Sequence, residues 1–326
     1  MGLPSQKPCR IIVLDNNVPQ ISLTYQPIIG DSVPEARRSD WEVSYELGDN
    51  ARKAMKTKRQ NSSLFKVDVI VYPELSFQNL IITQVYQVLF NISPAIEISL
   101  WKGMKIMGQV IFPIYNEYGD RYRQIREGYI TLSQSVRLPY NTFVKGTIGT
   151  FNARRWGFEV EAKHFLKWNS HFSVEGRIGY TGASRFENFA WHVSPLKRLT
   201  WSVGPNYYWS RFNTEFSVRA EQYLLGERGV RFDMRRDFRY ASVGFYAMSV
   251  ENANKNGGFY FQIMLPPYGK YKRKYVRVMP SKYFGVAYNA GNERYYGKSF
   301  AAELNTTYGY RNSFNPFYIK SELVNF

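Results

Sequence analysis

The sequence predicts an all-β protein, a transmembrane antiparallel up-and-down β-barrel of about 12–16 strands with a small N-terminal segment. Apolar and charged residues alternate along many segments, and aromatic residues make up 17% of the chain. No apolar run approaches the length of a membrane-spanning helix. Tilted strands of about ten residues are long enough to cross a membrane, and aromatic side chains supply the bands at its two surfaces.

The first part of the chain has a different residue pattern from the rest. Short β-like pieces (Arg10 to Leu14, Ile21 to Tyr25, Trp41 to Leu47) are separated by links that contain Pro and Asp, and 50–61 is a basic stretch without apolar periodicity. We interpret that stretch as a solvated loop or short helix. We expect 1–63 to form a periplasmic or lumen-inserted segment and 64–326 to form the barrel.

The start of the chain carries little targeting information. MGLPSQKPCR has no apolar signal core, so an exported protein is expected to have lost its signal peptide from the sequence shown. Cys9 is the single cysteine, which makes an internal disulfide impossible.

Strand patterns dominate from Leu64 onward. The apolar stretch 67–90 contains Pro73 and predicts two strands, and a hairpin around Lys102 and Gly103 follows. A long polar loop covers 116–128, and alternating segments continue from there. Later strands are expected near 199–209, 257–265, 283–290, 300–310 and 317–326, the last ending on an aromatic residue as outer-membrane proteins do.

The stretch 212–250 shows the alternation most clearly. Val230, Phe232, Met234 and Phe238 share one parity, charged residues take the other, and only Arg236 breaks the pattern. Gly226, Glu227 and Gly229 mark a tight turn, so three antiparallel strands are predicted here. The charged parity here and at 158–178 gives the candidate lumen-facing residues: Arg219, Glu221, Arg231, Asp233, Arg235, Asp237, Glu159, Glu161, Lys163 and Arg177.

A family resemblance covers about 187–266. Three stretches resemble the C-terminal part of the YjbH-type exopolysaccharide biosynthesis proteins. They are Tyr223-Leu224-Leu225-Gly226-Glu227-Arg228-Gly229, the charged strand after it, and GGFYFQIMLP. Leu225 replaces a small residue of that family and Glu227 replaces an Asp. The resemblance implies an outer-membrane barrel without a catalytic centre, associated with secretion or assembly of an extracellular polysaccharide.

The residues themselves predict no catalytic site, metal site or cofactor. A glycosidase needs two carboxylates on either side of the sugar bond. The candidates would be Glu159 with Glu161 and Asp233 with Asp237, but Lys and Arg are interleaved with them. We therefore interpret these carboxylates as electrostatic lining. His164, His171 and His192 lack metal-ligand spacing.

The formal net charge of +17 favours anionic partners. The partners we expect are outer-membrane lipid and lipopolysaccharide, an anionic polysaccharide and other envelope proteins. Pro266 to Val278 interleaves tyrosines with basic residues, as nucleic-acid sites do, but no nucleic-acid motif accompanies it. We interpret it as a cationic loop and expect no nucleic-acid partner.

The functional hypothesis is a non-enzymatic barrel of the bacterial outer membrane that assists exopolysaccharide export or assembly through a cationic, charged lumen. One alternative is an accessory or structural barrel of a multiprotein secretion complex, with a plugged lumen. Another is a soluble β-sandwich that binds glycans or other polyanions.

Overall fold

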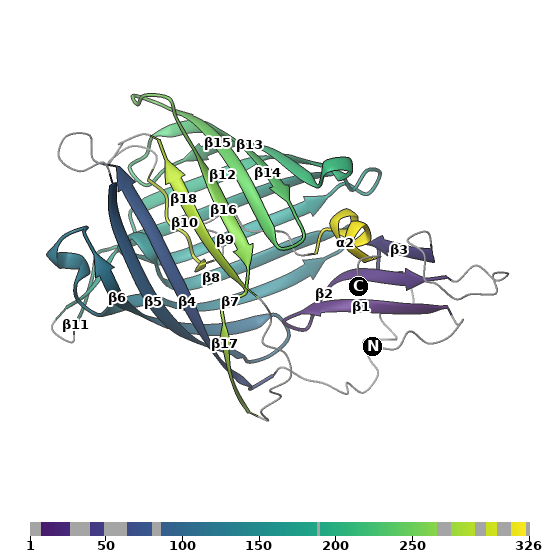
Figure 1. The fold of residues 1–326 in the computed structure, drawn as a ribbon, viewed down its shortest axis with the longest axis horizontal. Coiled ribbons are helices and arrows are strands. Elements are labelled where there is room, and N and C mark those ends of the chain that lie inside the picture. The colour runs from purple at the N-terminus through teal and green to yellow at the C-terminus, as the bar shows by residue number, and fades with distance from the viewer. Residues whose placement is uncertain are drawn as a thin grey trace.

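The computed structural model describes residues 8–26, 40–48, 64–79, 86–187, 190–265, 275–290, 298–304 and 314–323. The fold is mostly β, as predicted, with one strongly curved sheet of 15 strands and a separate sheet of three (Figure 1). A short helix near the C-terminus lies beside the small sheet.

The small sheet contains β1 (Cys9–Asp15), β2 (Val18–Tyr25) and β3 (Trp41–Ser44), all antiparallel. Ile21 and Trp41 belong to its buried core. Tyr45 stacks on Phe165 of the large sheet with ring centroids 3.9 Å apart. That 1–63 and 64–326 are separate domains stays a prediction.

The large sheet follows the predicted hairpin order, since successive strands pair antiparallel from β4 to β16, with β11 paired only to β10. Short 3-10 turns are η2 (Asp120–Tyr122), η3 (Asn152–Arg154) and η4 (Ser210–Phe212). The strands are β4 (Val67–Asn79), β5 (Tyr86–Ser99), β6 (Met104–Asn116), β7 (Arg126–Leu138), β8 (Thr142–Phe151), β9 (Arg155–Phe165), β10 (Phe172–Glu187), β11 (Ala190–Val193), β12 (Arg198–Trp209), β13 (Thr214–Gln222), β14 (Arg228–Asp237), β15 (Ala241–Val250), β16 (Asn256–Met264), β17 (Val276–Pro280) and β18 (Tyr283–Asn289).

One chain segment connects the two ends of this sheet. β17 pairs in parallel with β4, and β18, which follows it directly, pairs with β16. Between them, the Ser281 amide donates to the Val71 carbonyl over 2.9 Å. In the hydrogen-bonded order the sheet begins at β17 and ends at β18, so strand pairing alone does not define a closed barrel.

The hairpin connections lie at two opposite ends of the strands. We call one the turn end, with turns 100–103, 139–141, 166–171, 210–213 and 238–240, and the other the loop end, with connections 117–125, 152–154, 223–227 and 251–255. The small sheet contacts the turn end, where the Gly103 amide donates to the Asn16 carbonyl over 2.8 Å.

Arg137 at the end of β7 attaches the small sheet to the large one. Its guanidinium donates to the carbonyls of Pro19 and Gln20 over 3.2 and 2.8 Å, and also to the carbonyl of Tyr45. Bonds from a charged donor contribute about 1.5–3 kcal/mol each. We expect Arg137→Ala to loosen the small sheet, measured as faster proteolytic cleavage within the first 63 residues.

Arg211→Ala is the matched control, because Arg211 also lies at the turn end. Its side chain is exposed, with the guanidinium 5.6 Å from the centre of the Phe212 ring. Equal cleavage rates in the two variants would contradict the assigned role of Arg137.

The C-terminal region corrects the sequence prediction. Strands were expected at 300–310 and 317–326, whereas 298–304 is an irregular segment and α2 (Pro316–Glu322) is a helix. Asn315 explains the helix, because its side chain accepts from the amides of Phe317 and Tyr318, with Pro316 at the first helical position. The rest of both predicted strands lies outside the described residues.

Burial on the large sheet is the reverse of that in a water-soluble protein. Large apolar side chains are exposed on one face, including Val230 at 53% and Phe232 at 42%. The opposite face buries polar and charged side chains, including Asp233 and Asp237. The predicted alternation of faces is present, and the polar face is the sheltered one.

Candidate functional site

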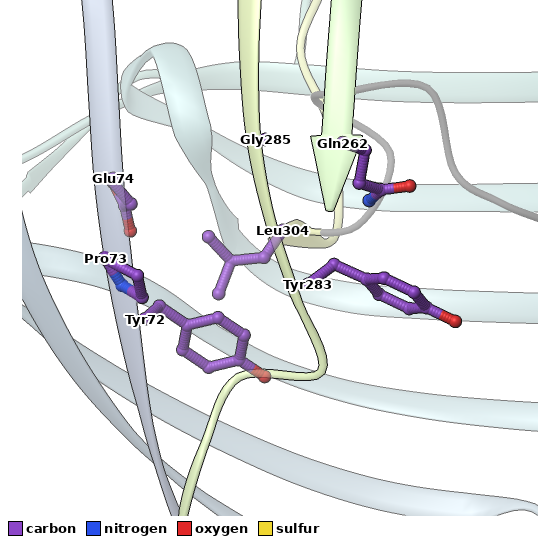
Figure 2. Close-up of a pocket in the computed structure, with 7 residues that line it drawn as sticks. All are labelled: Tyr72, Pro73, Glu74, Gln262, Tyr283, Gly285 and Leu304. Carbon is purple, nitrogen blue, oxygen red and sulfur yellow. The ribbon is translucent and has the colours of Figure 1, made fainter. Parts of the chain in front are cut away.

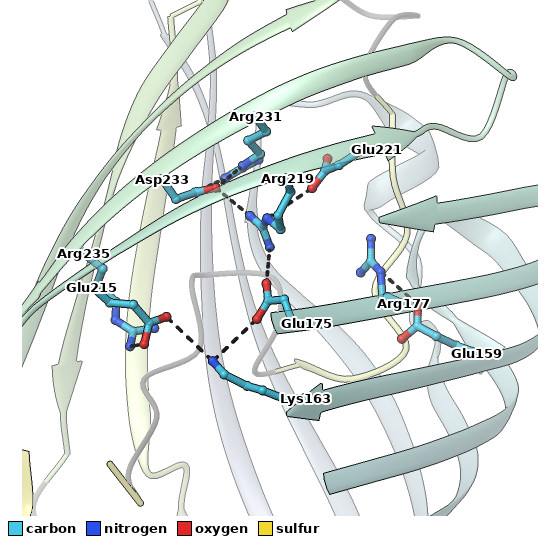
Figure 3. Close-up of polar contacts among 10 residues, drawn as sticks. All are labelled: Glu159, Lys163, Glu175, Arg177, Glu215, Arg219, Glu221, Arg231, Asp233 and Arg235. Atoms are coloured by element: carbon cyan, nitrogen blue, oxygen red, sulfur yellow. Dashed lines mark hydrogen bonds and ion pairs between the residues drawn. The ribbon is translucent and has the colours of Figure 1, made fainter. Parts of the chain in front are cut away.

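All the predicted charged candidates lie on the polar face of β9, β10, β13 and β14. Figure 3 shows the side chains of these strands pointing toward one another inside the curve of the sheet. Lys163 of β9 and Glu215 of β13 approach to 3.9 Å, although β10 and β12 separate their strands in the sheet. The contact therefore bridges the interior and depends on the curvature.

Arg219 is the centre of a first cluster of charges. Its guanidinium contacts Asp233 at 2.6 Å, Glu175 at 3.3 Å and Glu221 at 3.4 Å. Arg231 adds two hydrogen bonds of 2.8 Å to the same Asp233 carboxylate. The two guanidiniums repel one another less because they share this carboxylate.

Arg235 forms a second, more deeply buried cluster. It pairs with Asp237 at 3.3 Å and with Glu215 at 3.6 Å, and it exposes 9% of its side chain against 2% for Asp237. Lys163 joins the two clusters by contacting Glu215 and, at 3.6 Å, Glu175. The network is continuous from β9 to β14.

The remaining candidates form a third group on β8 to β10. Glu159 pairs with Arg177 at 3.6 Å, and Glu161 pairs with Lys145 at the same distance. Basic and acidic residues are equal in number among the predicted candidates. Sequence analysis identified both the basic and the acidic side chains, and the structure shows which of them pair.

Sequence reasoning missed the residues that link this region to the rest of the interior. Lys145 also pairs with Glu303 of the segment 298–304. Farther along the sheet, Lys105 contacts Glu97 at 3.3 Å, and the Tyr72 hydroxyl donates to Glu97 over 2.9 Å. The alternation at 95–107 could have placed Lys105 and Glu97 on one face, but no sequence pattern places Glu303 beside Lys145.

The segment 298–304 occupies the polar side of the sheet. Phe300 is 2% exposed and stacks on Phe151, with centroids 5.2 Å apart and planes 13° apart. Its ring lies so close to Gly179 that a Cβ there would come within 2.5 Å of it. The Ala301 amide donates to the Asn152 side chain over 2.6 Å. The segment is thus fitted between the strands.

The turn after β13 fixes the start of this segment. The Leu224 amide donates to the Lys298 carbonyl over 2.9 Å, and the Leu224 side chain is buried in one cluster with Phe300. Gly226 has a φ of 102°, which requires glycine, and a Cβ on Gly229 would approach the Ser249 carbonyl to 2.6 Å. Leu224 packs inward although it has the parity of the apolar residues of β13, because that strand ends at Gln222.

The environment of this turn also keeps Tyr223 neutral. Burial, and after it the neighbouring Glu221 carboxylate, raise the pKa of the Tyr223 phenol. Glu227 closes the turn through its backbone, since its carbonyl accepts from the Tyr223 amide over 2.9 Å. The predicted turn motif has a structural role at the start of the interior segment.

A small cavity lies near the seam between β4 and β18. Tyr72, Glu74, Gln262, Tyr283 and Leu304 lie around it, with Pro73 and Gly285 (Figure 2). Its volume is about 20 Å³, which holds a water molecule and is far too small for a sugar ring. This cavity is not a ligand site for a glycan.

Other predicted features bring no further chemistry. His171 stacks on Phe317 at 3.8 Å, and His164 bonds Thr142 over 2.8 Å, so both have structural contacts. Within the described residues, no cluster of acidic, histidine or cysteine side chains could hold a metal ion. In the same part of the chain, no helix is long and apolar enough to span a membrane. The basic stretch 50–61 and most of Pro266 to Val278 lie outside the described residues. Where the second stretch is described, Val276 to Val278 belong to strand β17, so this part of the predicted cationic loop is a strand.

Comparison of the chain with protein families, with curated proteins and with solved structures finds no match. The likeness around Tyr223 therefore rests on the quoted residues alone.

Proposed function

We propose that the chain is a non-enzymatic β-barrel of the bacterial outer membrane whose interior is filled. The observation that carries this proposal is the reversed burial of the large sheet, with apolar side chains exposed and ion pairs sheltered. A lipid bilayer stabilises such an apolar face, while water would not. A β-sandwich would instead bury these side chains between two sheets.

The ends of the sheet support closure. β4 and β16 both pair with the single segment 276–289, and two hydrogen bonds of 2.6 and 2.5 Å join Arg277 of β17 to Asp68 of β4. A continuous ring of strands leaves no unpaired edge in lipid, where each unpaired backbone group would cost several kcal/mol. Strands of 9 to 16 residues from β4 to β16, apart from the short β11, are long enough for tilted crossings.

The filled interior favours an accessory barrel over an open export pore. Basic side chains of the interior are paired with carboxylates, and the segment 298–304 lies on the same side of the sheet. A polymer would therefore meet the ends of the barrel rather than pass through it. From the resemblance, we propose that this accessory role is in export or assembly of an exopolysaccharide together with other envelope proteins.

Solubility tests the proposal. The full chain is expected to require detergent and, once folded, to migrate differently on a gel before and after heating. A protein that stays folded and monomeric in detergent-free buffer would contradict the barrel. In that case, salt-sensitive binding to an acidic glycan without lipid would support the soluble alternative.

A further inference from the structure

The turn end carries an exposed aromatic side chain at each of its hairpin turns. Trp168 is 76% exposed, Tyr140 is 74% exposed and Trp101 is 54% exposed. The other two turns contribute Phe212, Phe238 and Tyr240, all exposed. We call these aromatic residues, with the basic residues beside them, the collar.

Basic residues accompany the aromatic ones. Lys102 follows Trp101, Lys167 precedes Trp168 and Arg211 precedes Phe212, and all three basic side chains are exposed. The turn-end hairpin turns contain no acidic residue, whereas the loop-end connections mix Arg121, Arg123, Arg154 and Lys255 with Glu117, Asp120, Glu227 and Glu251. The two ends of the strands therefore differ in charge.

Arg236 is the clearest member of the collar. Between Val230 and Phe238 it is the one residue that breaks the alternation, and it lies exposed on the apolar face near the turn end. Its guanidinium lies 5.1 Å from the ring centre of Phe238 and 5.8 Å from that of Phe212. A cation between aromatic rings at the edge of an apolar face is typical of a lipid headgroup region.

We propose that the collar binds the headgroups of anionic phospholipids, which places the turn end at the inner leaflet of the outer membrane. This inference rests on the proposed barrel. The occupant follows from charge complementarity between the collar and phosphate groups. The hairpin turns on this side have three to six residues, whereas the nine-residue connection 117–125 and the connection from β10 to β12 lie on the other, and this favours the phospholipid leaflet over lipopolysaccharide.

Arg239 contributes less to the collar than the other basic residues. It contacts Glu322 of α2 at 3.8 Å, which neutralises part of its charge. The lipid-binding charges are therefore Lys102, Lys167, Arg211 and Arg236.

Lipid selectivity tests the inference. The full chain is placed in vesicles of phosphatidylcholine with phosphatidylglycerol, and tryptophan quenching is compared when one or the other lipid is brominated. Wild type is expected to prefer phosphatidylglycerol at least about fivefold. The variant with Lys102, Lys167, Arg211 and Arg236 all replaced by Gln is expected to lose the preference.

The matched control replaces Arg121, Arg123, Arg154 and Lys255 at the loop end by Gln and is expected to keep the preference. Heat-modifiable mobility verifies that each protein is inserted. A second set of vesicles contains lipid A in place of phosphatidylcholine. Inserted wild type that shows no preference in the first set, or a preference for lipid A over phosphatidylglycerol in the second, would overturn the inference and leave the barrel intact. Failure of wild type to insert would overturn the barrel itself.

Discussion

Replacing Arg235 by methionine is expected to lower the free energy of unfolding by about 3–5 kcal/mol, because it removes a cationic partner from two buried carboxylates. Asp237 would lose its contact at 3.3 Å and Glu215 one of its two cationic contacts. In the proposed barrel no bulk water reaches Asp237 to solvate it. Urea unfolding in detergent or lipid measures the loss.

Arg236→Met is the matched control, since the same substitution one residue along falls on the exposed face. The expected loss is below about 1 kcal/mol, the value of a surface cation–π contact. Equal losses in the two variants would show that the interior cluster is solvated and contributes little to stability.

Glu303→Lys is expected to displace the segment 298–304 from the interior and to make the proposed barrel conduct ions. Glu303 pairs with Lys145 and lies within electrostatic range of Lys105. A third ammonium group there would replace attraction by repulsion of about 4 kcal/mol per close pair near a protein surface. Planar-bilayer recording is expected to show no steady current for wild type and open channels for the variant.

Glu187→Lys provides the control for net charge. Glu187 is exposed at the end of β10, away from 298–304, so this variant is expected to remain closed. Conductance in wild type equal to that of Glu303→Lys would contradict the filled interior and favour an open pore.

Local alternation allowed much of the large sheet to be predicted. Side chains alternate faces in any strand, so the parity of Val230 to Phe238 separates the charged residues from the apolar ones and identifies Arg236 as the exception. Hairpin turns at Lys102-Gly103 and around Gly226 were also predictable, because turn residues act within a few positions of the chain.

The C-terminal region shows where such reasoning fails. Phe300 and Phe317 belong to apolar stretches that predict strands, yet one packs inside the curved sheet and the other on His171. Asn315-Pro316 was a helix-start signal that the aromatic pattern outweighed. The packing partners of both rings, Phe151 and His171, lie more than a hundred residues earlier in the chain.

The sequence by itself determined which residues share a face of each strand and where the chain turns, because both depend on neighbours in the chain. Within one strand it placed Arg231 beside Asp233 on the same face, but it did not determine which charges meet across the interior. Only the curvature of the sheet brings Lys163 to Glu215, and only the path of 298–304 brings Glu303 to Lys145. Tertiary structure thereby adds carboxylates distant in sequence, such as Glu175 and Glu215, to the charged face that alternation predicted.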